Sequence, residues 1–72
     1  MQYAIVIERE GESFGAYVPD LPGCIAVGES EEEARQLITE AIALHVEALR
    51  EDGEPVPMPR AHVGYVEIAA AA

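Results

Sequence analysis

Residues 31–52 carry the signals of one long helix with a defined start and a defined end. The run Ser-Glu-Glu-Glu at positions 30–33 is a capping box, in which the Ser30 hydroxyl can accept from the N–H of Glu33 while the Glu33 carboxylate reaches back. Gly53 suits the position just past the last turn, and the three prolines that follow forbid any continuation. The fold must therefore be built around a single helix of roughly 33 Å.

Apolar side chains recur along this helix at the period that gives it one broad hydrophobic face. The residues that fall on this face at 100° per residue are Ala34, Leu37, Ile38, Ala41, Ile42, Leu44, Ala48 and Leu49. Glu40, Glu47 and Arg50 lie on the opposite side. This pattern predicts a helix that packs one face against a sheet.

Three short strands are expected before the helix, at residues 3–8, 14–18 and 24–28. The first two are predicted to form a hairpin with a loop of four or five residues. Between the second and third, the segment Pro19-Asp20-Leu21-Pro22-Gly23 cannot continue a strand, because proline lacks the N–H that a ladder needs. Residues 61–69 are predicted as a fourth strand, and residues 69–72 as a frayed tail.

These elements predict one α+β domain over residues 1–72, with the order β-β-β-α-β. A meander of three strands, followed by a helical crossover, gives a four-stranded mixed sheet of order 3-2-1-4 with the helix on one face. Apolar residues point to both faces of this sheet, so the uncovered face is expected to meet another subunit or a partner. A domain of 72 residues with the single cysteine Cys24 has no disulfide to stabilise it, so a dimer or tetramer is expected.

The charge balance limits the classes of partner. Fourteen acidic residues stand against four basic ones, for a net charge of −10. A chain without a basic stripe does not suit nucleic acid or an anionic membrane, whereas it suits a basic protein. The alternative is that the acidic residues only keep the protein soluble. No apolar run reaches a membrane span of ~20 residues, and the first residues do not resemble a signal peptide, so a cytoplasmic protein is expected.

No residue pattern indicates catalysis, a metal site or a cofactor. Glu8 and Glu67 would approach each other if the fourth strand lay beside the first, but two edge glutamates are more often a solvated fringe. His45 is interpreted as a buried or interfacial histidine and His62 as a surface residue. Cys24 is interpreted as a small packing residue, because no basic neighbour or histidine is adjacent to activate the thiol.

Several of these motifs together resemble the HicB-like antitoxin family over about residues 3–59. The residues that carry the resemblance are Asp20-Leu21-Pro22-Gly23-Cys24, Gly28-Glu29-Ser30, Glu33-Ala34 and Gly53-Glu54-Pro55-Val56-Pro57. The resemblance implies a partial ribonuclease-H-like fold that binds and neutralises HicA, a small basic toxin that cleaves RNA through a histidine. Longer relatives add a DNA-binding domain, and because only alanines follow the expected fourth strand here, direct DNA binding by this chain is not expected.

Two groups of residues are assigned roles on this basis. The predicted partner-binding residues are Asp20, Leu21, Glu31, Glu32, Glu40 and Glu47. The predicted structural turn and cap residues are Pro19, Pro22, Gly23, Gly28, Ser30, Glu33 and Gly53. The alternative function is a solitary, homo-oligomeric ligand-binding or scaffold module that keeps the fold without a toxin.

Overall fold

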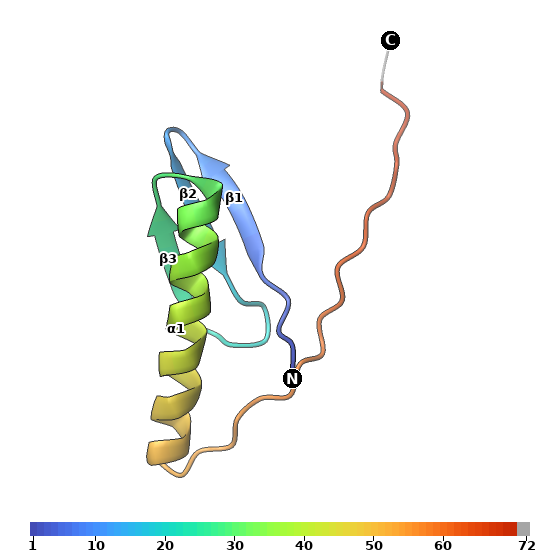
Figure 1. Cartoon of the computed structure of the whole chain (residues 1–72). Coiled ribbons are helices and arrows are strands. Elements are labelled where there is room, and N and C mark those ends of the chain that lie inside the picture. Colours follow the sequence, from blue (N-terminus) through green and yellow to red (C-terminus); the bar gives the residue numbers. More distant parts are fainter. Residues whose placement is uncertain (71–72) are drawn as a thin grey trace.

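The computed structural model describes residues 1–70 and contains a three-stranded sheet crossed by one helix (Figure 1). In chain order the elements are β1 (Val6–Glu10), β2 (Ser13–Tyr17), β3 (Ile25–Gly28) and α1 (Glu31–Glu51). The sheet is an antiparallel meander of order β1-β2-β3, and α1 covers one of its faces. The α+β class and the meander of the first three strands are confirmed.

The first hairpin is tighter than predicted. Glu10 pairs with Ser13, so only Gly11 and Glu12 form the turn. Gly11 has a positive φ of 63° and Glu12 has a negative φ, which are the φ signs of a type II′ turn. Because this turn matches the twist of the strands, pairing continues to Glu10, beyond the predicted end of the strand at Glu8.

Both ends of α1 are capped by local hydrogen bonds. At the start, the Ser30 hydroxyl accepts from the N–H of Glu33 at 3.0 Å, and the Glu33 carboxylate accepts from the N–H of Glu29 at 3.0 Å. At the end, Gly53 has a φ of 69°, and the N–H groups of residues 53 and 54 donate back to the carbonyls of residues 50 and 49. This is a Schellman motif, which requires a left-handed residue where Gly53 lies.

Gly28 lies where β3 passes closest to the first turn of α1. A Cβ at Gly28 would be 2.7 Å from the backbone nitrogen of Ala34 and 3.1 Å from its Cα. Both are backbone atoms, so no side-chain movement can relieve the contact. The glycine therefore permits the short connection that brings the helix onto the sheet.

The core is small and lies between α1, the sheet and the loop that joins β2 to β3. Its buried residues are Ala16, Val18, Leu21, Cys24, Ala34, Ile38 and Val46. The predicted apolar face of the helix was too wide: Leu44 is 68% exposed and Ala48 is also exposed, while Val46, which the prediction left out, is buried. A three-stranded sheet covers only a narrow stripe of the helix, so the flanks of the predicted face stay in solvent.

The predicted fourth strand is absent from the described residues, and the order 3-2-1-4 was therefore wrong in its last member. Residues 61–70, called here the extended segment, leave the body of the molecule on the side of β1 (Figure 1). The Cα radius of gyration is 14.5 Å, against about 11 Å for a compact chain of this length. A strand exists only when another strand pairs with it, and the extended segment has no such partner within the described part of the chain. Of the predicted frayed tail, residues 71–72 lie outside the described residues.

Candidate protein-binding surfaces

The loop between β2 and β3 is built from two consecutive tight turns. The N–H of Leu21 donates to the carbonyl of Val18 at 3.1 Å, and the N–H of Cys24 donates to the carbonyl of Leu21 at 3.1 Å. Pro19 and Pro22 each follow the first residue of a turn, where a φ near −65° is needed, and Gly23 has the φ of 84° that a type II turn requires. The sequence therefore dictates a rigid loop at this position.

This loop turns Leu21 inward, which corrects the prediction that Leu21 is an exposed anchor for a partner. The Leu21 side chain is 1% exposed and is one of the two largest fully buried side chains of the protein. Leu21 is the residue that the two turns share, and Val18 and Cys24 at their outer ends are buried beside it. The surface of the loop is formed instead by the exposed residues Pro19, Pro22 and Gly23.

Asp20 binds the protein's own backbone. Its carboxylate accepts hydrogen bonds from the N–H groups of Arg60 at 2.8 Å and Ala61 at 2.9 Å. These two backbone hydrogen bonds, that of Ala61 first, lower the pKa of Asp20 below its ordinary value. Asp20 therefore tethers the base of the extended segment to the loop, a role that the sequence did not reveal because 40 residues separate the partners.

A second tether holds the connection between α1 and the extended segment. The Tyr3 hydroxyl donates to the carbonyl of Pro57. This bond joins a residue that precedes β1 to the middle of the proline-rich connection, so that the second half of the connection is held beside the start of the chain (Figure 1).

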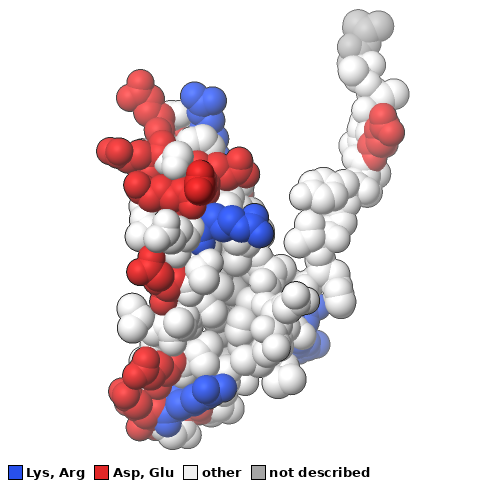
Figure 2. Space-filling model, viewed as in Figure 1, with Lys and Arg blue, Asp and Glu red and all other residues white. Residues whose placement is uncertain are grey.

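The acidic residues assigned to partner binding on α1 are exposed. Glu31, Glu32, Glu40 and Glu47 all lie on the solvent side of the helix. Figure 2 shows acidic side chains gathered where the helix begins, and a second group where it ends. Glu32 and Glu40 also line a shallow cavity of about 400 Å³, together with Arg35, Gln36 and Thr39.

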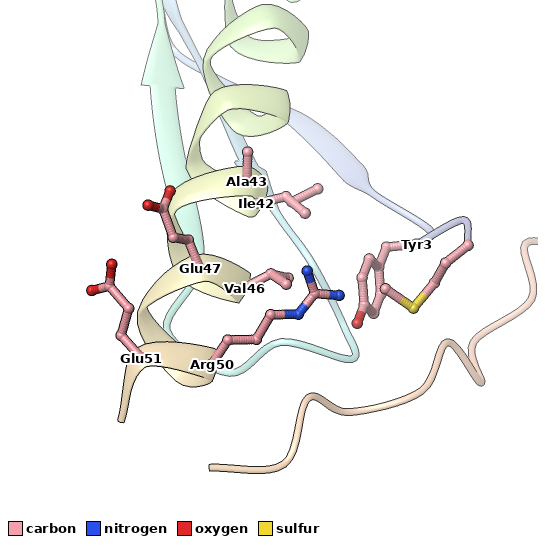
Figure 3. Close-up of a pocket in the computed structure, with 8 residues that line it drawn as sticks. Tyr3, Ile42, Ala43, Val46, Glu47, Arg50 and Glu51 are labelled. Atoms are coloured by element: carbon pink, nitrogen blue, oxygen red, sulfur yellow. The ribbon is translucent and has the colours of Figure 1, made fainter. Parts of the chain in front are cut away.

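An open, largely apolar groove of about 690 Å³ runs between the end of α1 and the start of the chain (Figure 3). Ile42 and Val46 line it from the helix, and Tyr3 lines it from the opposite side. Figure 3 shows Arg50 reaching across toward Tyr3, while Glu47 and Glu51 point outward. The residues that line the groove are Met1, Tyr3, Ile42, Ala43, Val46, Glu47, Arg50 and Glu51. Sequence reasoning missed this groove because its wall comes from residues that precede the first strand.

The sheet face opposite α1 is uncovered and partly apolar. Ile25 and Val27 on β3 are 68% and 64% exposed, and Tyr17 on β2 pairs with Ile25. Gly15 lies at the centre of the middle strand with no heavy atom near its absent side chain, and it lines a hollow of about 190 Å³. This agrees with the expectation that one helix leaves the other face of the sheet without cover.

The remaining candidate residues lie in the core, on α1 and on the extended segment. Cys24 is buried, and desolvation raises the pKa of its thiol, so the thiolate that reacts with oxidants and metals is disfavoured. His45 is half-buried on α1 and His62 is exposed at the base of the extended segment. Glu67 lies on the extended segment, which does not pair with β1, so the predicted approach of Glu67 to Glu8 is not formed.

Within residues 1–70 no three His, Cys, Asp or Glu side chains come together in a way that could hold a metal ion. The same residues contain no helix that is long and apolar enough to cross a membrane.

Comparison with known proteins identifies the family. Residues 3–69 match the model of the HicB-like antitoxin of bacterial toxin-antitoxin systems. This chain belongs to the HicB-like antitoxin family. The resemblance carried by the loop and helix-cap motifs is confirmed.

Solved structures agree with this assignment of the HicB-like chain. It resembles the N-terminal domain of the antitoxin HicB from Burkholderia pseudomallei with a TM-score of 0.75 and 36% identity, over 86% of this chain and 74% of that one. It also resembles a chain of a HicA3 and HicB3 toxin-antitoxin complex with a TM-score of 0.70 and 37% identity, over 82% and 70% of the two chains.

A curated relative is an uncharacterized 14.9 kDa protein of Haemophilus phage HP1, from the region between the rep and hol genes. It is 40% identical over 57 residues, which are 79% of the HicB-like chain and 43% of the phage protein. The chain thus spans less than half the length of this relative.

Proposed function

We propose that this HicB-like chain neutralises a basic, RNA-cleaving toxin of the HicA type by binding to it and covering its RNA-binding surface, without catalysis of its own. The observation that supports the proposal most is the likeness, at 37% identity, to a chain of a toxin-antitoxin complex. The net charge of −10 adds a physical reason, because an acidic protein can take the place of RNA on a basic surface. We place this interaction in the cytoplasm.

The exposed carboxylates of α1 are the proposed contacts with the toxin. Glu31, Glu32, Glu40 and Glu47 make no hydrogen bond to the protein's own residues in the described part of the chain, so they are free to pair with arginines and lysines. Asp20 is less available, because its carboxylate already holds the backbone at residues 60 and 61. The proposed electrostatic contact therefore consists of the predicted carboxylates of α1 and no longer includes Asp20.

Apolar contact is proposed to come from the groove at the end of α1. Ile42, Val46 and Tyr3 offer apolar surface there, and Glu47 and Glu51 flank it with negative charge. An apolar centre with a charged rim is the usual composition of a protein interface. A basic toxin with one protruding apolar side chain would suit this groove.

The test is co-expression with the basic reading frame that neighbours the gene, followed by size-exclusion chromatography and an RNA-cleavage assay. A mixed complex that suppresses cleavage is expected. The double variant Glu40→Lys, Glu47→Lys should weaken binding by about tenfold or more, because it sets like charges against each other. Glu12→Lys, on the exposed hairpin turn, makes a smaller change of the same kind away from α1 and should bind as the wild type does. Equal binding by all three proteins would contradict the proposed surface.

The alternative function is a homo-oligomeric ligand-binding or scaffold module that has no toxin. The uncovered sheet face and the exposed extended segment favour it, because both can be covered by copies of the same chain. Two observations together would favour this alternative: no small basic reading frame neighbours the gene, and the protein forms a homo-oligomer that does not bind basic proteins.

A further inference from the structure

The chain exposes more solvent-accessible surface than a compact monomer of the same mass. Its solvent-accessible surface is 5826 Å² for 7.7 kDa, whereas a compact monomer of that mass exposes about 4,300 Å². The excess is about 1,500 Å² per chain, and two chains that buried it would hide up to about 3,000 Å². Stable protein interfaces bury about 1,200–2,000 Å² in total, so the excess is large enough for a stable dimer.

Much of the exposed apolar surface lies on the extended segment. Tyr65 is 93% exposed, Val66 87% and Ile68 82%. The segment from 61 to 70 contains one formally charged residue, Glu67, in a chain whose net charge is −10. The segment contains β-branched and aromatic residues and no proline, which is the composition of a strand.

A free strand edge lies on the same side of the molecule. β1 pairs with β2 along one edge, and among the described residues no strand pairs with the other. The two tethers, Asp20 to residues 60 and 61 and Tyr3 to Pro57, hold the base of the extended segment on the side of β1 (Figure 1). From these observations we propose that the extended segment of one copy pairs, antiparallel, with the free edge of β1 in a second copy.

Repulsion between like charges disfavours pairing of the extended segment with β1 of its own chain. Residues 61–63 line the same shallow cavity as residues 2–4, and the segment then runs in the direction of β1. Pairing within one chain would thus be parallel, with His62 near Tyr3 and Glu67 near Glu8. Like charges opposite each other destabilise a strand pair.

Antiparallel pairing removes this repulsion and is open only to a second copy. It places the start of the segment, with Arg60 and His62, toward the acidic end of β1 at Glu8 and Glu10. It places Glu67 toward the apolar residues that precede β1. The exposed edge and the exposed segment are then covered together, and this contact does not depend on the proposed binding of a toxin.

The direct test is an isotope-filtered NOE experiment on an equal mixture of ¹³C,¹⁵N-labelled and unlabelled chains. We expect NOEs between copies in the order of antiparallel strands, which join residues 61–64 of one chain to residues 7–10 of the other and residues 65–68 to residues 3–6. NOEs from the segment to β1 within one chain, NOEs between two extended segments, or a monomer at NMR concentration would each overturn the proposal.

A pair of proline variants gives a second test with its own control. Successive N–H groups of a strand point in opposite directions, so Tyr65→Pro and Val66→Pro cannot both remove a hydrogen bond to the partner. One of them should raise the dimer dissociation constant by about tenfold or more, since one lost hydrogen bond with its strand distortion has this size, and the other should change it much less. Far-UV circular dichroism should show that α1 is intact in both. Dimers of equal strength in both variants would contradict strand pairing.

Discussion

Gly28 is the residue at which the sheet and the helix come closest. Gly28→Ala should destabilise the fold by about 1–3 kcal/mol, because the new Cβ would press on the backbone of Ala34 at 2.7 Å. Gly15→Ala is the matched control. Gly15 lies in β2 with open space around the added carbon, so this variant should have the same free energy of unfolding as the wild type. Urea unfolding of the two variants and the wild type measures the difference. Equal stability of the two variants would contradict the role given to Gly28.

Asp20 gives the tether of the extended segment a dependence on pH. Its pKa in the folded protein lies below the ordinary 3.8, so its contribution to stability is complete above pH 3.8 and is lost as the pH falls through the lower, folded value. The amide proton shifts of Arg60 and Ala61 should therefore titrate with a midpoint below 3.8.

The same titration should be absent in Asp20→Asn. Asp52→Asn, which changes an exposed carboxylate at the end of α1, should leave it in place. A midpoint at or above 3.8 in the wild type would show that the tether does not form in solution.

Single residues of the loop show where sequence reasoning succeeds and where it fails. The turn residues Pro19, Pro22 and Gly23 could be recognised because a turn depends on the φ angles of its own few residues. The inward direction of Leu21 and the backbone partners of Asp20 depend on chain segments far away in the sequence. Nothing in the loop itself contains that information.

At the scale of the element, the capping of α1 can be tested at Ser30. Ser30→Ala should lower the free energy of unfolding by about 1 kcal/mol, because the N–H of Glu33 loses its acceptor. Ser13→Ala changes an exposed serine at the start of β2 and should have a smaller effect. Thermal and urea unfolding give both values. A loss of unfolding free energy in Ser13→Ala as large as that in Ser30→Ala would contradict the capping role of Ser30.

The elements differ in how far the sequence determines them. The bounds of α1 follow from the cap at Ser30 and from Gly53, which act through neighbouring residues, and they were predicted to within about one residue. The apolar side chains of the helix were predicted less well: periodicity cannot tell that Val46 packs on the sheet while Leu44 does not. Residues 61–69 have the composition of a strand, but composition does not supply a partner.

At the scale of the whole molecule, the negative charge should act mainly on the rate at which a basic partner arrives. Raising the ionic strength should slow association with the proposed toxin by about tenfold or more, while dissociation changes little. Stopped-flow or surface-plasmon measurements across a salt series separate the two rates. A salt effect confined to dissociation would show that short-range contacts, and not the overall field, carry the charge dependence.

The proline-rich connection between α1 and the extended segment has a mechanical consequence. Proline occupies every second position from 55 to 59, and each ring fixes one backbone torsion. Such a sequence behaves as a semi-rigid spacer of about 3.1 Å per residue, whose unbound form samples few conformations. Little conformational entropy is then left to lose when residues 61–70 are immobilised against another molecule. The stiff connection would thus lower the entropic cost of either proposed association.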